Sequence, residues 1–261
     1  MMLALLLAAA QAAHPAHATN PAPVLMADIS PVRQRYENCL QLAAKNPAAA
    51  EKEASSWMLG GGTFLAHQCL GLAYTAQSRW SAGAAEFELA ARGADVARDD
   101  RSAYFWAQAG NAWLAAKDAG RARADLDAAL APHSLVGLQS GEAYLDRARA
   151  YVATGNMAAA RADLDHAVVE ADRDPLAWLL SATLARRTGD LPRAKKDIAE
   201  ALQRASNDAS VQLEAGNIAA KDGDEAGAKA AWGRAAALQP GSPANRSAVA
   251  ALAQFDAPAK P

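Results

Sequence analysis

One short segment recurs along the chain, and its period constrains the fold more than any other feature. Residues 122–129 read Ala-Arg-Ala-Asp-Leu-Asp-Ala-Ala, and they return almost unchanged at 160–167 and more loosely at 194–201 and 228–235. In each copy a small residue is followed four positions later by a large apolar residue, and alanine follows three positions after that. This spacing places all three side chains on one face of a helix. The chain therefore repeats a helical building block.

The turns and the composition point to the same class of fold. Gly155, Gly189 and Gly223 are spaced 34 positions apart, where glycine can end a helix in a left-handed conformation without steric cost. Alanine, the best helix former, is abundant, whereas aromatic residues make up 6% of the chain and isoleucine occurs only three times. A β-sheet needs β-branched and aromatic residues to cover its pleated surface. We therefore expect an all-α protein whose helices pack closely through alanine.

Three further features resemble a known family. Trp178 stands four positions before the small residue Ala182, residues 213–217 read Leu-Glu-Ala-Gly-Asn, and residues 238–240 close a repeat with Leu-Gln-Pro. Together with the 34-residue period, they make the chain resemble the tetratricopeptide repeat (TPR) family. The resemblance implies an α-solenoid of helix–turn–helix units stacked into a right-handed superhelix.

We expect five such repeats across residues 64–242, with less regular segments on either side. The repeats are expected at about 64–97, 103–136, 141–174, 175–208 and 209–242. The flanking segments are a degenerate helix pair at 31–60, a capping helix at 243–255 and a disordered tail at 256–261. The first two spacings exceed 34 by four or five residues, which either an added helical turn or a longer loop between repeats would supply.

The N-terminus is typical of a secretory signal peptide. A short apolar run is followed by small residues, and the cleavage pattern small-x-small occurs at residues 16–18 and again at 10–12. We expect a signal peptide over residues 1–18, cleaved after Ala18 or alternatively after Ala12, and hence a periplasmic or secreted protein. No lysine or arginine precedes Arg33, so a short buried helix or an apolar arm on a cytoplasmic protein is the alternative. No cysteine lies close to the apolar run, which argues against a lipid anchor.

The two cysteines, Cys39 and Cys69, are 30 residues apart and lie on predicted helices. An even number of cysteines in an exported protein favours a disulfide bond. The alternative is a pair of buried free thiols. We predict a disulfide that fastens the N-terminal end of the helical array.

The sequence contains no recognisable catalytic or metal-binding motif, and we expect neither an enzyme nor a cofactor. His14 and His17 lie in the expected signal peptide, and the other three histidines lie in unrelated repeats. The aspartates of the repeated segment are interpreted as a solvated helix face, which comprises Asp125, Asp127, Asp163 and Asp165. A net charge of −2 gives no electrostatic basis for binding nucleic acid. No apolar stretch reaches the roughly 18 to 20 residues that a membrane span requires.

The resemblance implies a site on the first helices of successive repeats, which in this family line a concave groove for peptides or partner helices. Asn111 and Asn217 follow glycine, and their amides can donate to and accept from a peptide backbone. Arg149, Arg186 and Arg187 are also candidates for a basic stretch. The exposed groove positions expected from the register are Gln68, Tyr104, Asn111, Arg149, Thr183, Arg186 and Asn217.

These features favour an exported scaffold that binds a protein or peptide partner, with a role in cell-envelope assembly as one possibility. Two other hypotheses remain open: an accessory or regulatory subunit of an envelope enzyme complex, and a structural protein that associates with itself. Fold alone does not choose among them.

Overall fold

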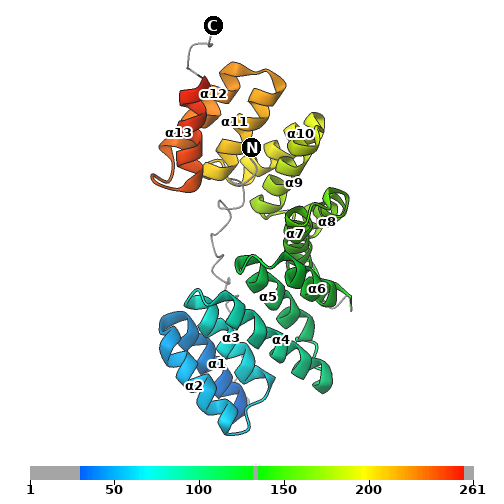
Figure 1. The fold of residues 1–261 in the computed structure, drawn as a ribbon, viewed down its shortest axis with the longest axis vertical. Coiled ribbons are helices and arrows are strands. Elements are labelled where there is room, and N and C mark those ends of the chain that lie inside the picture. Colours follow the sequence, from blue (N-terminus) through cyan, green and yellow to red (C-terminus); the bar gives the residue numbers. More distant parts are fainter. Residues whose placement is uncertain (1–29, 132–134, 256–261) are drawn as a thin grey trace, which may run out of the picture. The chain divides into compact units, whose positions relative to one another are not determined.

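The structure is a computed structural model, and it describes residues 30–131 and 135–255. The expected signal peptide and the expected C-terminal tail lie outside these residues. Within them the chain forms thirteen α-helices and no β-strand (Figure 1). The prediction of an all-α chain of stacked helix pairs is therefore confirmed. The helices are α1 (Pro31–Lys45), α2 (Pro47–Leu59), α3 (Phe64–Ala76), α4 (Trp80–Ala97), α5 (Ser102–Ala115), α6 (Ala119–Leu130), α7 (Leu138–Ala153), α8 (Met157–Glu170), α9 (Pro175–Thr188), α10 (Leu191–Arg204), α11 (Ala209–Asp222), α12 (Glu225–Ala237) and α13 (Pro243–Phe255).

The helices divide into two compact units, and the division falls within α8, between Asp163 and Leu164. In the N-terminal unit, each helix from α2 to α6 contacts the next one along the chain, and α1 contacts both α2 and α3. In the C-terminal unit, the same holds from α9 to α13. The first helices of neighbouring pairs also contact each other, as α5 does with α7 and α9 with α11. Each unit is thus a stack of helix pairs.

Local sequence signals set the ends of these helices. Asp190, Asp208 and Asp224 each accept a backbone N–H of the first turn, which satisfies a donor that the helix itself leaves unpaired. At the opposite ends of α9 and α11, Gly189 and Gly223 have φ angles of 88° and 84°. These positive values confirm the predicted left-handed helix ends.

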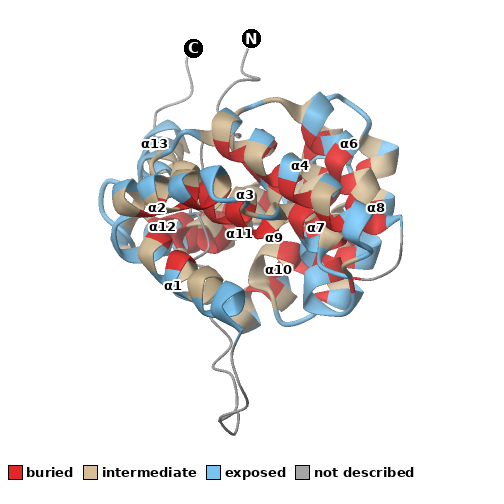
Figure 2. Cartoon of the chain, turned by 90° about the horizontal axis from the view of Figure 1, so that it is seen from below, coloured by how far each residue is buried: buried red, intermediate tan, exposed pale blue. Residues whose placement is uncertain are grey.

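Alanine fills the interfaces between helices. Ala129, Ala167, Ala201 and Ala235, which occupy the same position in successive repeats, are all fully buried. Figure 2 shows buried residues where helices face one another and exposed residues on the outer turns. Small side chains leave room for close approach, and Gly216 of α11 lies directly against the ring of Trp232 of α12. The abundance of alanine is therefore explained by the many interfaces at which helices pack closely through small side chains.

The longer first spacing between repeats corresponds to an added helical turn. Helix α4 has 18 residues, whereas the equivalent helix α10 has 14. The four additional residues amount to about one turn of 3.6 residues. Of the two alternatives left open by the sequence, the longer helix accounts for this repeat.

A disulfide joins the first helix to the repeats, as predicted. Cys39 of α1 is bonded to Cys69 of α3, with a Cα–Cα distance of 6.1 Å. Both residues are fully buried, next to Ala54 and Leu70. The bond therefore fixes α1 onto the first helix of the first repeat.

Candidate functional site

A chain of hydrogen bonds crosses the first helices of the N-terminal unit. The hydroxyl of Tyr36 on α1 donates to Oε1 of Gln68 on α3 at 2.6 Å. The amide Nε2 of Gln68 donates to Oε1 of Gln108 on α5 at 3.2 Å. Within α5, Nε2 of Gln108 then donates to the hydroxyl of Tyr104 at 3.1 Å. These bonds link the first helices of neighbouring pairs to one another. We call the surface formed by the first helices the first-helix face.

The same face continues from α5 to α7 through Asn111. Its Nδ2 donates to Oδ2 of Asp146 at 2.7 Å, and Nη1 of Arg149 donates to the other oxygen of that carboxylate at 2.8 Å. Tyr104, Gln108 and Asn111 are spaced i, i+4 and i+7, so they form one row along α5. We call these three residues the neutral stripe.

The expected groove residues are not all exposed: Gln68 is buried, and four others are half-buried, which are Arg149, Thr183, Arg186 and Asn217. Tyr104 has 37% of its surface exposed, and Asn111 is exposed, as the register predicts. Gln68, by contrast, is 2% exposed, and its amide is hydrogen-bonded to Tyr36 and Gln108. Sequence reasoning missed Gln108, although its place one helical turn after Tyr104 could have revealed it.

The two tyrosine hydroxyls of this face stay neutral. Burial raises the pKa of Tyr36 to about 12 and also raises the pKa of Tyr104 above its usual value of 10. At neutral pH both hydroxyls therefore remain protonated and serve as uncharged hydrogen-bond donors and acceptors.

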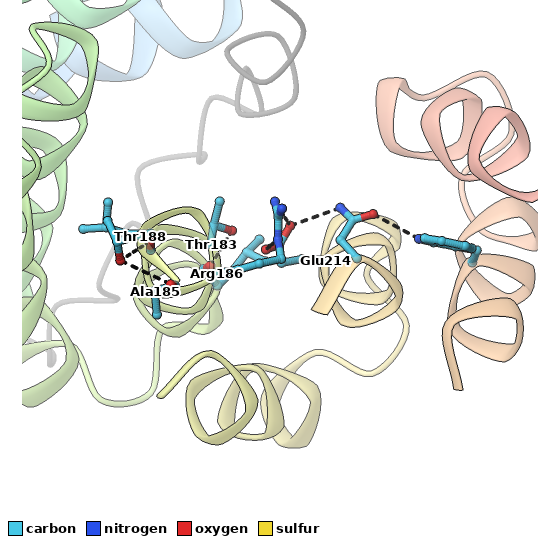
Figure 3. Close-up of polar contacts among 9 residues, drawn as sticks. Thr183, Ala185, Arg186, Thr188 and Glu214 are labelled. Atoms are coloured by element: carbon cyan, nitrogen blue, oxygen red, sulfur yellow. Dashed lines mark hydrogen bonds and ion pairs between the residues drawn. The ribbon is translucent and has the colours of Figure 1, made fainter. Parts of the chain in front are cut away.

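In the C-terminal unit a second polar ladder links α9, α11 and α12 (Figure 3). Arg186 donates from Nε and Nη2 to the two carboxylate oxygens of Glu214, at 2.6 and 3.2 Å. Asn217 donates from Nδ2 to Glu214 at 3.2 Å and accepts from the indole N–H of Trp232 at 3.1 Å. The hydroxyl of Thr183 donates to a carbonyl of its own helix at 2.8 Å.

The expected basic stretch is therefore corrected. Arg149 is in an ion pair with Asp146, and Arg186 is in a bidentate ion pair with Glu214. The two carboxylates, Asp146 and Glu214, lie on first helices, three residues before the candidates Arg149 and Asn217. The groove residues expected from the register do not include them. Two of the three candidate cations are neutralised within the fold and are not available as a concentrated positive charge.

The aspartates of the repeated segment do not form one solvated face. Asp127 and Asp165 are partly exposed, as expected, but Asp125 and Asp163 are only 7% and 4% exposed. Asp163 receives two hydrogen bonds of 2.8 Å from the guanidinium of Arg147 on α7. Asp125 and Asp163 each stand directly before a buried leucine, and this position faces the first helix of the same pair. The expectation that these two aspartates are solvated was therefore wrong.

The described residues form no candidate metal-binding cluster. His67 meets Glu86 at 2.7 Å in an isolated pair, and no cluster of three or more potential metal ligands occurs in residues 30–131 and 135–255. Within the same ranges, no helix combines the length and apolar character needed to cross a bilayer. The groups that the fold brings together on these faces are amides, hydroxyls and paired carboxylate and guanidinium groups.

The comparisons with known proteins bear on the fold. No protein-family model matches the chain, and no curated protein matches it in sequence. Among solved structures, PilW, a type IV pilus biogenesis factor, is similar with a TM-score of 0.67 and 18% identity over 83% of this chain and 99% of PilW. PilF of Pseudomonas aeruginosa is similar with a TM-score of 0.65 and 16% identity over 85% of this chain and 100% of PilF.

A third similar structure is described as a TPR protein. YrrB, a TPR protein with an unusual peptide-binding site, has a TM-score of 0.54 and 18% identity over 71% of this chain and 90% of YrrB. At these identities the likeness concerns the path of the backbone. It agrees with the 34-residue period and the paired helices, and the chain therefore has the tetratricopeptide repeat fold.

Proposed function

We propose that this chain is an exported scaffold protein that binds an extended segment of a partner protein on its first-helix face. The observation that carries the proposal is the neutral stripe of α5. Tyr104 and Asn111 are exposed there, and Gln108 lies half-buried between them. A row of hydrogen-bonding side chains with no catalytic group beside it is suited to holding a polypeptide.

The spacing of the stripe suits an extended chain. Tyr104 and Gln108 are four residues apart, which is about 6 Å along the helix axis. Groups that point the same way along an extended peptide recur every second residue, or about 6.6 Å. An amide side chain both donates and accepts, so it can pair with either group of a peptide bond. Two neighbouring positions of the stripe can therefore engage one peptide backbone.

Two observations support an exported protein with a role in assembling the cell envelope. The bond between Cys39 and Cys69 is typical of proteins from oxidising compartments. The similar structure PilW is a type IV pilus biogenesis factor, which makes an envelope complex a reasonable place to search for the partner.

A site-specific photocrosslinker tests the binding face. It is placed at Asn111 in one variant and at Ala124, exposed on the second helix α6, in the matched control. Expressed in the native organism, the Asn111 variant should capture a discrete partner that the Ala124 variant does not. Equal capture by both variants, or none by either, would refute binding at this face.

The N-terminus of the purified native protein tests export separately. Cleavage should leave a chain that begins directly after Ala18 or after Ala12. A mature protein that retains Met1 would contradict the signal-peptide assignment while leaving the binding face untouched.

A further inference from the structure

The charged residues of the first two repeats are confined to one side of each helix pair. The first helices α3 and α5 contain no Asp, Glu, Lys or Arg. Their partners α4 and α6 contain eight such residues between them, which are Glu86, Glu88, Arg92, Asp95, Arg121, Arg123, Asp125 and Asp127. The face made by α3 and α5 is therefore uncharged over two successive repeats, although 21% of the whole chain is charged.

Charged groups border this face in the turn before α5 and on α7. Asp99 and Arg101, in the turn before α5, form an ion pair at 2.7 Å. On the α7 side, Asp146 is held by Arg149 at 2.8 Å. The one imidazole of these two helices, His67, is paired with Glu86 on α4 at 2.7 Å. Glu142 of α7 also lies close enough to Tyr104 for its charge to add to the effect of burial in raising the pKa of that hydroxyl. The two ion pairs keep Arg101 and Arg149 bound to carboxylates of the fold.

The hydrogen-bonding capacity left on the stripe is balanced. Gln108 accepts from Gln68 and donates to Tyr104, which leaves its amide with one further N–H and one further lone pair. Tyr104 accepts from Gln108, so its own O–H hydrogen points elsewhere. Asn111 uses one N–H on Asp146 and retains its carbonyl oxygen and the second N–H. One donor and one acceptor at each amide match the needs of a peptide group.

We propose that the neutral stripe, Tyr104, Gln108 and Asn111, selects extended peptide segments that lack charged side chains. The inference rests on the proposed function and names the ligand class of that same face. A charged side chain brought against a half-buried neutral surface loses hydration and gains no opposite charge in return. Neutral polar and apolar side chains lose much less. Selection therefore acts by excluding charge, and binding depends little on salt because no ion pair is formed.

Selection from a library of random peptides displayed on phage tests the ligand class. The full exported chain is immobilised, and the content of Asp, Glu, Lys and Arg in the enriched peptides is compared with that of the starting library. We expect a clear depletion of all four residues. We also expect the dissociation constant of an enriched peptide to change by less than about twofold when NaCl is raised from about 50 to about 500 mM.

A matched pair of variants assigns the effect to the stripe. Gln108→Glu introduces one negative charge while keeping an acceptor for Gln68, and it should shift the enriched peptides toward Lys and Arg. Ala124→Glu adds the same charge on the outer helix α6 and should leave the selection as in the parent protein. A Gln108→Glu variant that selects the same peptides as the parent would overturn the assignment to this stripe.

The remaining outcomes separate the inference from the proposed function. Enrichment of acidic or basic peptides, or a tenfold or greater loss of affinity at high salt, would overturn the inference while supporting peptide binding. No enrichment above the level obtained with uncoated support would overturn both.

Discussion

Asp125 is expected to make the protein less stable as the pH rises, and replacing it with asparagine should remove that effect. The side chain is 7% exposed, and its Oδ2 has no hydrogen-bond partner. Burial raises the pKa of Asp125 to about 7, and the negative charge of Glu88 adds to the shift. Arg92, the indole of Trp113 and Arg121 oppose it without cancelling it. Asp125 thus keeps its proton at a pH where an exposed aspartate is ionised.

The size of the effect follows from the difference between the folded and unfolded pKa values. In the unfolded chain the pKa of an aspartate is about 3.9. Between about pH 4 and pH 7 the folded protein therefore holds one proton more than the unfolded chain, and each pH unit lowers the free energy of unfolding by about 1.4 kcal/mol. The loss reaches about 4 kcal/mol near pH 7 and does not grow further above it. Below pH 4 both states are protonated and the contribution disappears.

Urea unfolding of the parent and of Asp125→Asn at several pH values between about 4 and 8 measures this difference, because other titrating groups cancel between the two proteins. The stability of the variant relative to the parent should rise by about 1.4 kcal/mol per pH unit up to pH 7. Asp163→Asn is the matched control. It breaks the buried pair with Arg147 and should cost about 3 to 5 kcal/mol without such a rise. A flat difference curve for Asp125→Asn would refute the reasoning.

Two further predictions concern the packing of the array. Replacing Cys39 and Cys69 together by alanine should lower the free energy of unfolding by about 3.6 kcal/mol in the chain-entropy model, because the bond closes a loop across a separation of 30 residues. Chemical denaturation of the oxidised parent and of the variant measures the difference, and equal stability would contradict it. Gly216→Ala would place a Cβ 2.5 Å from Nε1 of Trp232 and should destabilise the protein by about 1 to 3 kcal/mol. Gly233→Ala on the open side of α12, where a Cβ meets nothing within 4 Å, should instead stabilise it by about 1 kcal/mol. Melting temperatures that move in the same direction for both glycine variants would show that the space around the glycine does not decide the outcome.

The sequence predicts the helices and their turns well because the signals that specify them are local. The left-handed glycines, such as Gly189, and the alanines that repeat at helical spacing act within a few residues of their own position. The candidate groove is predicted less completely. The register identifies Asn111 and Arg186, but their partners Asp146 and Glu214 lie 35 and 28 residues away. The packing of neighbouring helices decides which side chains meet across that distance. The spacing of residues within one repeat does not predict these contacts.

The buried aspartates show how one position of the repeat acquires different chemistry. Asp125 and Asp163 occupy the same position of their repeats. Each stands 15 positions after a small residue of the first helix, which is Gly110 or Ala148. The residue just before that small residue is Arg147 in one repeat and Ala109 in the other. Where it is arginine, the carboxylate is paired; where it is alanine, one carboxylate oxygen has no partner and the pKa rises to about 7. The repeat therefore conserves the shape of the helix interface while its polar pairing varies from one pair of helices to the next. In the first two repeats the charged residues of the helices lie on the second helices, α4 and α6. The first-helix face of α3 and α5 therefore has no charged residue of its own. The proposed selection of neutral peptides depends on this property.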